Sequence, residues 1–443
     1  MYPNFVRVIA LGAIVCMMSF APALAVPAFA AKTGQRCSAC HIGGFGPQLT
    51  PFGRAFKLGG YTLDAGTNAF PVSAMAVASF LHTATDQAES PAPHYGANDN
   101  ITLDQASLFV AGGIGDHLGG FMQFTYDGVG RHFSWDNIDL RVTNQSSFAG
   151  ADIQYGLSIN NNPGVQDAWN TLPAWGFPYT DSALAPAPAT GTLFDGALAQ
   201  TVLGTTAFIT WNQSIYTEAG LYWTPSNGFL KAFGSDFGPG PIAGVAPYVR
   251  VAYQKDYGDQ NFEVGAFGFF PRLHPGGDFS TGTSDLHSDL GLDASYQFLG
   301  DGTNITTVNL RYTHEHQSLA ASQLLGLSAN RSNTLEDFRV DAAYYWKNWI
   351  GGTVQWFNTW GSTDTLLYAN NATLKPDSSG FRFQIDATLW GTDISPLGER
   401  FNMRVGLQYM IYTQFDGAGT NYDGSGRNAS DNNTLRLFTW FAL

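Results

Sequence analysis

Apolar and polar residues alternate with a period of two, in one segment after another, from about residue 71 to residue 443. The clearest segment has one apolar face, made of Phe401, Met403, Val405, Leu407, Tyr409 and Ile411, and one polar face, made of Asn402, Arg404, Gly406 and Gln408. Successive side chains of a β-strand point to opposite sides, so this pattern is typical of strands with two unlike faces. It restricts most of the chain to an all-β fold, either a water-soluble sandwich or a barrel in a membrane.

The lengths of the connections favour the barrel. We expect about sixteen strands, near residues 71–83, 103–113, 118–127, 133–144, 151–161, 205–212, 214–225, 244–255, 260–270, 285–298, 303–316, 333–346, 349–361, 379–390, 400–415 and 431–443. Short turns then alternate with long loops, as in outer-membrane barrels, whose periplasmic turns are short and whose outer loops are long. The sequence therefore predicts an all-β transmembrane barrel of antiparallel strands over residues 71–443. Its polar faces would line the lumen, and outer-membrane lipid would surround it.

Two sets of side chains follow from this barrel. Mixed lumen charges are expected from Arg141, Arg250, Arg311, Arg339, Arg382, Arg404 and Arg436 with Asp139, Asp152, Glu263, Asp289, Asp293, Asp337, Asp341 and Asp386. Aromatic girdles at the membrane interfaces are expected from Trp223, Trp349, Trp356, Trp360 and Tyr412.

Composition excludes other classes of protein. The net charge is −14 and only 13% of the residues are charged, so the chain offers no basic surface for nucleic acid. A content of 44% hydrophobic residues, with 33 Phe, 19 Tyr and 11 Trp, excludes a disordered chain. No run of 18 apolar residues occurs after residue 30, which excludes a helical membrane protein.

Residues 1–30 are typical of a cleaved export signal. Arg7 precedes an apolar stretch from Val8 to Phe20, and two cleavage sites of the A-x-A type follow, one ending at Ala25 and one at Ala30. We expect cleavage after Ala30, export from the cytoplasm and residence in the outer membrane of a Gram-negative bacterium.

The mature chain keeps two cysteines, Cys37 and Cys40, and they are followed directly by His41. This C-x-x-C-H string is the attachment signature of one c-type haem: the two thiols add to the porphyrin vinyl groups and the histidine ligates the iron. A disulfide, a thiol redox pair or a zinc site would use the same cysteines. However, no βαβ pattern surrounds them, and the next histidine is as distant as His82.

A short helix is expected directly after the motif. Thr50 suits its N-cap, Pro51 its first position and Gly59 its end. Phe52, Ala55 and Phe56 would then share a face that could pack on the porphyrin. Arg36, Arg54 and Lys57 could pair with its propionates, or these residues could form a local core with solvated charges.

The expected haem segment, residues 31–70, is too short to enclose a haem alone and has no Met or second His after His41. We therefore expect it in or at the lumen of the barrel, which would complete the pocket. The distal iron ligand would come from beyond residue 70. Met75 and His82 are favoured by proximity, and the further candidates are His94, His117, His132 and His287.

This layout resembles the outer-membrane monohaem cytochrome and porin fusions of iron-oxidising bacteria. The resemblance extends over the whole chain, but its specific residues are the C-x-x-C-H motif and the stretch from Pro51 to Lys57. It implies that Cys37 and Cys40 carry the haem and that His41 is the proximal ligand. It also implies that iron(II), as an extracellular ion or mineral, donates electrons, and that a periplasmic cytochrome accepts them.

Other functions stay open at this point. The haem could be structural or sensory in a diffusion porin, or the electron donor could be something other than iron. Acidic residues in the loops would attract divalent cations or merely keep the surface soluble. An enzyme with its own catalytic residues is the least favoured class, since Glu315 between His314 and His316 is the one dense titratable cluster.

Overall fold

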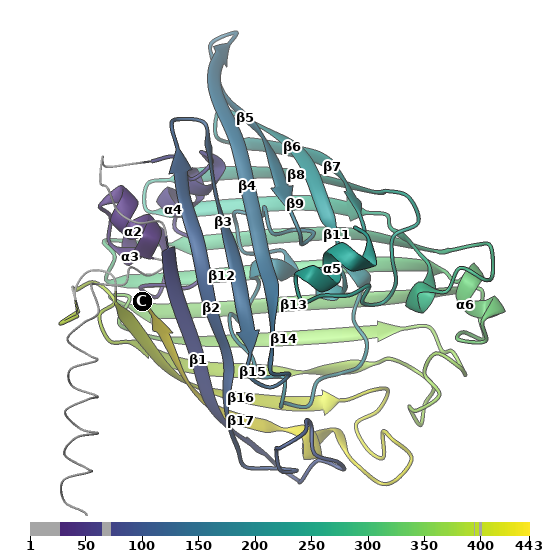
Figure 1. Cartoon of the computed structure of the whole chain (residues 1–443). Coiled ribbons are helices and arrows are strands. Elements are labelled where there is room, and N and C mark those ends of the chain that lie inside the picture. Colours follow the sequence, from purple (N-terminus) through teal and green to yellow (C-terminus); the bar gives the residue numbers. More distant parts are fainter. Residues whose placement is uncertain (1–26, 64–71, 394, 398–400) are drawn as a thin grey trace, which may run out of the picture.

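The computed structural model describes residues 27–63, 72–393, 395–397 and 401–443. Within them, sixteen long strands and one two-residue strand form a single antiparallel sheet that closes on itself (Figure 1). The strands are β1 (Val72–Thr83), β2 (Asn100–Ile114), β3 (Leu118–Asp127), β4 (His132–Phe148), β5 (Ala151–Asn160), β6 (Leu203–Trp211), β7 (Ile215–Trp223), β8 (Ala246–Tyr257), β9 (Gln260–Phe269), β10 (Arg272–Leu273), β11 (Asp285–Phe298), β12 (Asn304–Ser318), β13 (Ser332–Trp346), β14 (Ile350–Gly361), β15 (Ser378–Thr388), β16 (Asn402–Gln414) and β17 (Thr434–Ala442). Pairing of β1 with β17, which places Met75 opposite Ala442, closes the barrel.

The barrel confirms the expected fold class and strand count. β3 and β11 have the expected bounds, and most other strands differ from them by no more than three residues at either end. β10 was not expected, because a two-residue bridge carries no alternation that a sequence pattern could reveal. Most of the expected signal peptide and the expected boundary at residue 70 lie outside the described residues.

The barrel is turned inside out relative to a water-soluble protein. Large apolar side chains face outward, with Ile101 79% exposed and Ile385 64% exposed, while Arg141, Arg250 and Arg404 are fully buried. Apolar surface of this extent needs lipid around it, so the barrel spans a membrane in the manner of outer-membrane proteins and the sandwich is excluded. Among the described helices, none has both the length and the apolar character to cross a membrane.

The lumen holds the expected mixed charges as ion pairs. Arg141 pairs with Asp139 at 2.9 Å, and Arg404 pairs with Asp386 at 3.4 Å. Two expectations were wrong. Asp152 is exposed in the β4–β5 hairpin instead of lining the lumen. Tyr412 belongs to the inward face of β16, where it is 5% exposed, and is therefore not part of a girdle.

The two ends of the barrel differ. The end that carries Val72, Ala442 and mostly short turns is called the turn end; the opposite end carries most of the long connections and is called the loop end. In outer-membrane barrels the short turns face the periplasm, which assigns the turn end to that side.

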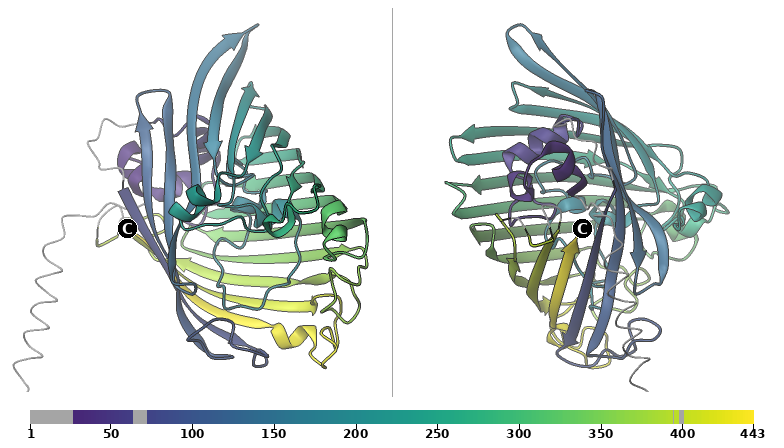
Figure 2. Two further views of the ribbon diagram at one scale, coloured as in Figure 1. Left: turned by 45° about the vertical axis from the view of Figure 1, so that its right-hand side comes forward. Right: turned by 60° about the vertical axis from the view of Figure 1, so that its left-hand side comes forward.

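The described residues that precede β1 fold inside the mouth of the turn end (Figures 1 and 2). They contain α2 (Pro27–Thr33), α3 (Cys37–Cys40) and α4 (Pro51–Leu58), and we call residues 27–63 the plug. The remaining helical turns lie in the connections between strands: η1 (Pro173–Trp175), η2 (Leu193–Ala197), α5 (Asn227–Ala232), η3 (Pro275–Gly277), α6 (Ala320–Leu324) and η4 (Ala429–Asn432).

Hydrogen bonds join the plug to the barrel wall on several sides. The Gly43 amide donates to Asn348 Oδ1 at 2.8 Å, and the Gly43 carbonyl accepts from Arg404 Nη2 at 2.8 Å. Gln48 donates to Thr307 of β12 at 2.7 Å, and Tyr61 donates to Asp139 of β4 at 2.8 Å. The segment expected in or at the lumen is thus bonded to it.

Candidate functional site

The C-x-x-C-H motif forms one helical turn followed by a reversal of the chain. The His41 amide donates to the Cys37 carbonyl at 2.9 Å, which closes α3. Thr50 then holds the motif from the other side: its amide donates to the Cys40 carbonyl at 2.9 Å and its hydroxyl to the Ala39 carbonyl at 2.6 Å. Both thiols are free and half-buried.

Helix α4 packs directly on this turn. The Thr50 hydroxyl accepts from the Gly53 amide at 3.2 Å, so Thr50 is the N-cap that the sequence predicted, and Pro51 is the first residue of the helix. A Cβ atom at position 53 would lie 2.3 Å from the Cys40 carbonyl oxygen. Only glycine therefore permits this close approach between α4 and the motif.

The helix presents a different face to its surroundings than expected. Gly53, Arg54 and Lys57 are buried, whereas Phe52 is 42% exposed and Ala55 is exposed. Of the expected apolar face, Phe56 packs against an apolar cluster, while Phe52 and Ala55 remain exposed, so the side of α4 that meets the lumen is mixed in polarity.

Cys37, Cys40 and His41 line one cavity of about 510 Å³, which we call the inner cavity. Its wall combines the plug, residues of β1 to β4, and Trp440 and Ala442 of β17. Aromatic rings of Phe56, Phe109, Phe121, Trp175 and Tyr179 contribute to it. This volume lies within the range of about 300–1,000 Å³ that is usual for small-molecule and cofactor sites.

The structure brings some of the predicted site residues together and separates others. Phe56 and Met75 line the inner cavity with the motif, but Phe52 and Arg54 do not. Arg54 instead donates to Gln297 Oε1 of the barrel wall at 2.6 Å. The two other expected propionate partners, Arg36 and Lys57, do line the cavity.

The two favoured distal ligands lie on opposite faces of β1. Met75 shares the inward face with the buried residues Val77 and Leu81. His82 lies on the outward face near the loop end, with its side chain 48% exposed and its ring bonded to Asp99 at 2.8 Å. Among the described histidines, His41 alone lines the inner cavity. The four more distant candidates for the distal ligand are therefore not at this cavity: His94, His117, His132 and His287.

Burial sets the protonation of the motif. Desolvation, and then the positive charge of Arg404, lowers the pKa of His41 to about 4. Desolvation followed by the neighbouring Cys37 raises the pKa of Cys40 to about 12. The imidazole is therefore neutral at physiological pH, which is the form that ligates a metal.

A long connection that sequence reasoning left as an outer loop closes the inner cavity from the loop side. Residues 161–202, between β5 and β6, fold into the lumen and are called the inner loop. Its residues 165–172 are almost fully buried, and Pro173–Thr180 supply one wall of the cavity. A run of apolar and aromatic residues with few charges was the available signal, but it does not separate a loop inside a barrel from one outside.

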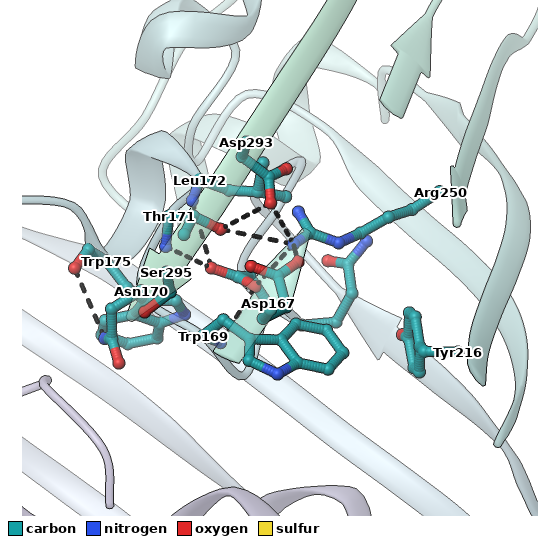
Figure 3. Close-up of polar contacts among 12 residues, drawn as sticks. Asp167, Trp169, Asn170, Thr171, Leu172, Trp175, Tyr216, Arg250, Asp293 and Ser295 are labelled. Carbon is teal, nitrogen blue, oxygen red and sulfur yellow. Dashed lines mark hydrogen bonds and ion pairs between the residues drawn. The ribbon is translucent and has the colours of Figure 1, made fainter. Parts of the chain in front are cut away.

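Buried charges hold the inner loop in place (Figure 3). Asp167 accepts from the amides of Trp169 and Thr171 at 3.1 and 3.0 Å. Arg250 of β8 lies 3.3 Å from Asp167 and 2.9 Å from Asp293 of β11. The loop is thereby tied to two strands of the wall by a network in which the buried charges have partners.

Lys57 connects the plug to the inner loop. Its Nζ donates to the carbonyls of Val165 and Asp167 at 2.7 and 2.6 Å, and it lies 4.8 Å from the centre of the Trp175 ring. Burial lowers the pKa of this amine to about 7. The plug and the inner loop meet at this buried side chain and also at Asn170, which accepts from the Leu49 amide at 2.9 Å and donates to the Pro47 carbonyl at 2.8 Å.

The Glu315 cluster is divided by the strand that carries it. Glu315 points inward and accepts from the Leu193 amide at 2.5 Å, whereas His314 bonds Glu336 at 2.6 Å with its side chain 39% exposed. Within the described ranges, no group of three or more His, Cys, Asp or Glu side chains converges on a point that could hold a bare metal ion.

The residues at the inner cavity fit a covalently attached haem. Two cysteines three positions apart and an adjacent neutral histidine are the donor set of a c-type haem. Their opening into one cavity with aromatic walls agrees with that chemistry.

No family model and no curated protein matches this chain. Solved porin structures resemble it. Salmonella typhi OmpF in complex with daunomycin has a TM-score of 0.48 at 14% identity, with 84% of this chain and 97% of that chain covered. An anion-selective porin from Comamonas acidovorans has a TM-score of 0.45 at 11% identity, with 84% and 99% covered.

The plug bears on where the export signal is cut. Ala28 is 0% exposed, and the Phe29 ring stacks on Tyr61 at 5.3 Å and meets Phe56 edge-on at 5.0 Å. Cleavage after Ala30 would remove these contacts, each worth about 0.5–1.5 kcal/mol for an aromatic pair. The structure therefore favours the other A-x-A site over the one expected from the sequence, and we expect the mature chain to begin at residue 26, after Ala25. Intact-mass measurement of the protein from outer membranes decides this, and a mass that starts at residue 31 would contradict it.

Proposed function

We propose that this protein carries electrons through the outer membrane by means of one c-type haem held in its barrel. The observation that carries the proposal is the shared cavity: Cys37, Cys40 and His41 open into a space that the plug, the barrel wall and the inner loop bound together. Such a haem, when bound, supplies one-electron oxidation and reduction at its iron.

The residues of the chain have distinct roles in this proposal. Cys37 and Cys40 provide the thioether sulfurs, and His41 provides the proximal nitrogen. Met75 is the candidate distal ligand, because it is the thioether on the inward face of β1. Arg36 lines the cavity on its exposed side and offers a cation to the propionates.

The two sides of the barrel suit different partners. The plug lies at the turn end and exposes Phe52 and Arg36, a surface where a periplasmic electron-carrier cytochrome could approach. The donor would arrive at the loop end, and iron(II) is the donor that the family resemblance implies. The protein would then act as an iron(II) oxidase that passes electrons inward.

The second candidate function is a diffusion porin with a structural or sensory haem. The barrel alone would suit it. The plug and the inner loop favour the conduit, because both fold inside the lumen and bond to each other there through Lys57.

Replacing both thiols tests the cofactor. In Cys37→Ser/Cys40→Ser we expect the barrel to insert and the covalent haem to be lost, since serine hydroxyls do not add to vinyl groups. Haem-stained denaturing gels and intact mass read this out. A haem band that persists in the double variant would end the assignment.

Met75 and His82 form a matched pair for the distal ligand. Met75→Leu keeps volume and removes the sulfur, so the iron spin state and reduction potential should change while covalent haem is retained. His82→Gln, on the outward face, should leave the absorption spectrum and potential as in the wild type. The reverse result would assign the ligand to His82 and show that the inward face of β1 does not supply it.

Conductance in planar bilayers separates the two functions. We expect the pure wild-type protein to be nearly silent. Lys57→Met leaves two buried carbonyls without their donor, at about 1–3 kcal/mol each, and should raise the frequency of open events. Lys375→Met, at a side chain that is 45% exposed, is the control. Large steady conductance of the wild type would favour the diffusion porin.

A further inference from the structure

A second cavity, of about 310 Å³, lies in the lumen on the side of the loop end. Its wall is formed by β13 to β17 and by the inner-loop stretch 181–195. Thr359, Met410 and Thr434, which line it, lie near the loop ends of their strands. We call this space the outer cavity.

A thin partition separates the outer cavity from the inner one. Asp181 lines both cavities. Beside it, the Thr180 carbonyl accepts from Arg436 Nη1 at 3.1 Å and from Gln408 Nε2 at 3.2 Å. Arg436 lines the outer cavity and donates to Asp104, which lines the inner one, at 2.6 Å. A ligand in the outer cavity would therefore lie one layer of residues from the inner cavity.

Charged side chains of both signs line the outer cavity, and its arginines have carboxylate partners: Arg436 binds Asp104 at 2.6 Å and Arg339 binds Asp337 at 3.0 Å. Three arginines line it, namely Arg339, Arg382 and Arg436, against two carboxylates, Asp181 and Asp195. Arg382 of β15 holds Asp181 at 3.2 Å, and Arg339 of β13 holds Asp195. Both ion pairs join an arginine of the barrel wall to a carboxylate of the inner loop. Each of these two guanidinium groups therefore already binds a carboxylate, which is the group that a polycarboxylate ligand would present.

These arginines keep free donors that face an accessible space. The side chain of Arg382 is 15% exposed and that of Arg339 is 29% exposed. Within the described part of the chain, Arg382 donates through Nη2 alone, which leaves Nε and Nη1 available. A guanidinium matches a carboxylate through two parallel hydrogen bonds. The Ser182 hydroxyl adds a further polar partner, whereas the Thr359 hydroxyl already donates to Asp337 and the Gln355 amide to the Phe177 carbonyl.

We propose that the outer cavity binds a small polycarboxylate, either free or as the chelate of a metal ion. Its size is at the lower end of the range for small-molecule sites, about 300–1,000 Å³. The Nε and Nη1 donors of Arg382 can bond a carboxylate of such a ligand, whereas its charge repels a bare cation. As the entry point of an electron donor, the site rests on the proposed function; as an anion site, it does not need the haem.

Calorimetric titration of the purified full-length protein in detergent tests this site, with citrate, magnesium citrate and Mg²⁺ alone as ligands at low ionic strength. We expect citrate or its magnesium complex to bind saturably. Arg382→Gln should weaken this binding by at least about tenfold, because a charge-assisted hydrogen bond is lost. The affinity of Arg382→Lys should lie between those of the wild type and Arg382→Gln, because lysine keeps the positive charge but lacks the two parallel donors of the guanidinium group. Arg331→Gln, on the exposed connection between β12 and β13, is the matched control.

The outcomes separate the sources of the ligand and the two proposals. If metal-free citrate binds and its magnesium complex does not, the ligand is a free polycarboxylate. If the magnesium complex binds more tightly than metal-free citrate, the ligand is a metal chelate. Equal affinity in wild type and Arg382→Gln, or binding of Mg²⁺ alone in place of citrate, would overturn the site. A variant that no longer shows the gel shift of a folded barrel is replaced by Arg339→Gln. If the haem band persists in the cysteine double variant, the haem assignment fails, but the result of this titration still stands.

Discussion

Every other feature of the structure depends on the solvent that surrounds the barrel. In lipid, backbone polar groups must be paired within the protein, and a closed sheet achieves this for all its strands. The apolar side chains then face outward, and the charged ones have no place but the lumen. This is why arginines such as Arg141 and Arg250 are among the largest fully buried side chains. Any segment that folds inside must be compatible with a polar wall.

The plug and the inner loop both meet that requirement, in different ways. The plug buries Arg54 and Lys57, the charged side of α4, and leaves Phe52 to the mouth. The inner loop buries Asp167 against Arg250 of the wall. Between these two bodies a space remains whose lining combines aromatic rings with polar side chains, and the cysteines and the histidine share this space. A cavity with several aromatic walls thus lies within a polar lumen, and strand patterns alone could not predict it.

Much of the fold could be predicted from the sequence, because a period of two residues reports directly on strands and loop length reports on the two ends of a barrel. The C-x-x-C-H motif likewise indicates its chemistry without a structure. Contacts between segments far apart in the sequence could not be predicted from these patterns. The alternation of β1 in the sequence already places Met75 and His82 on opposite faces, but the structure was required to show which face is inward. The inner loop could not be found, since its path depends on ion pairs with β8 and β11. The outer cavity could not be found for the same reason.

The pairing of β1 with β17 has a consequence for assembly. Met75 of β1 and Trp440 and Ala442 of β17 all line the inner cavity, and the plug is the segment immediately before β1. These strands are the first and the last of the barrel, so their pairing joins residues from the two ends of the sequence. The pocket consequently does not exist in any partly assembled barrel, however many of the intervening strands have formed. Closure of the barrel and completion of the inner cavity therefore coincide, and a chain that fails to close also lacks the finished cavity.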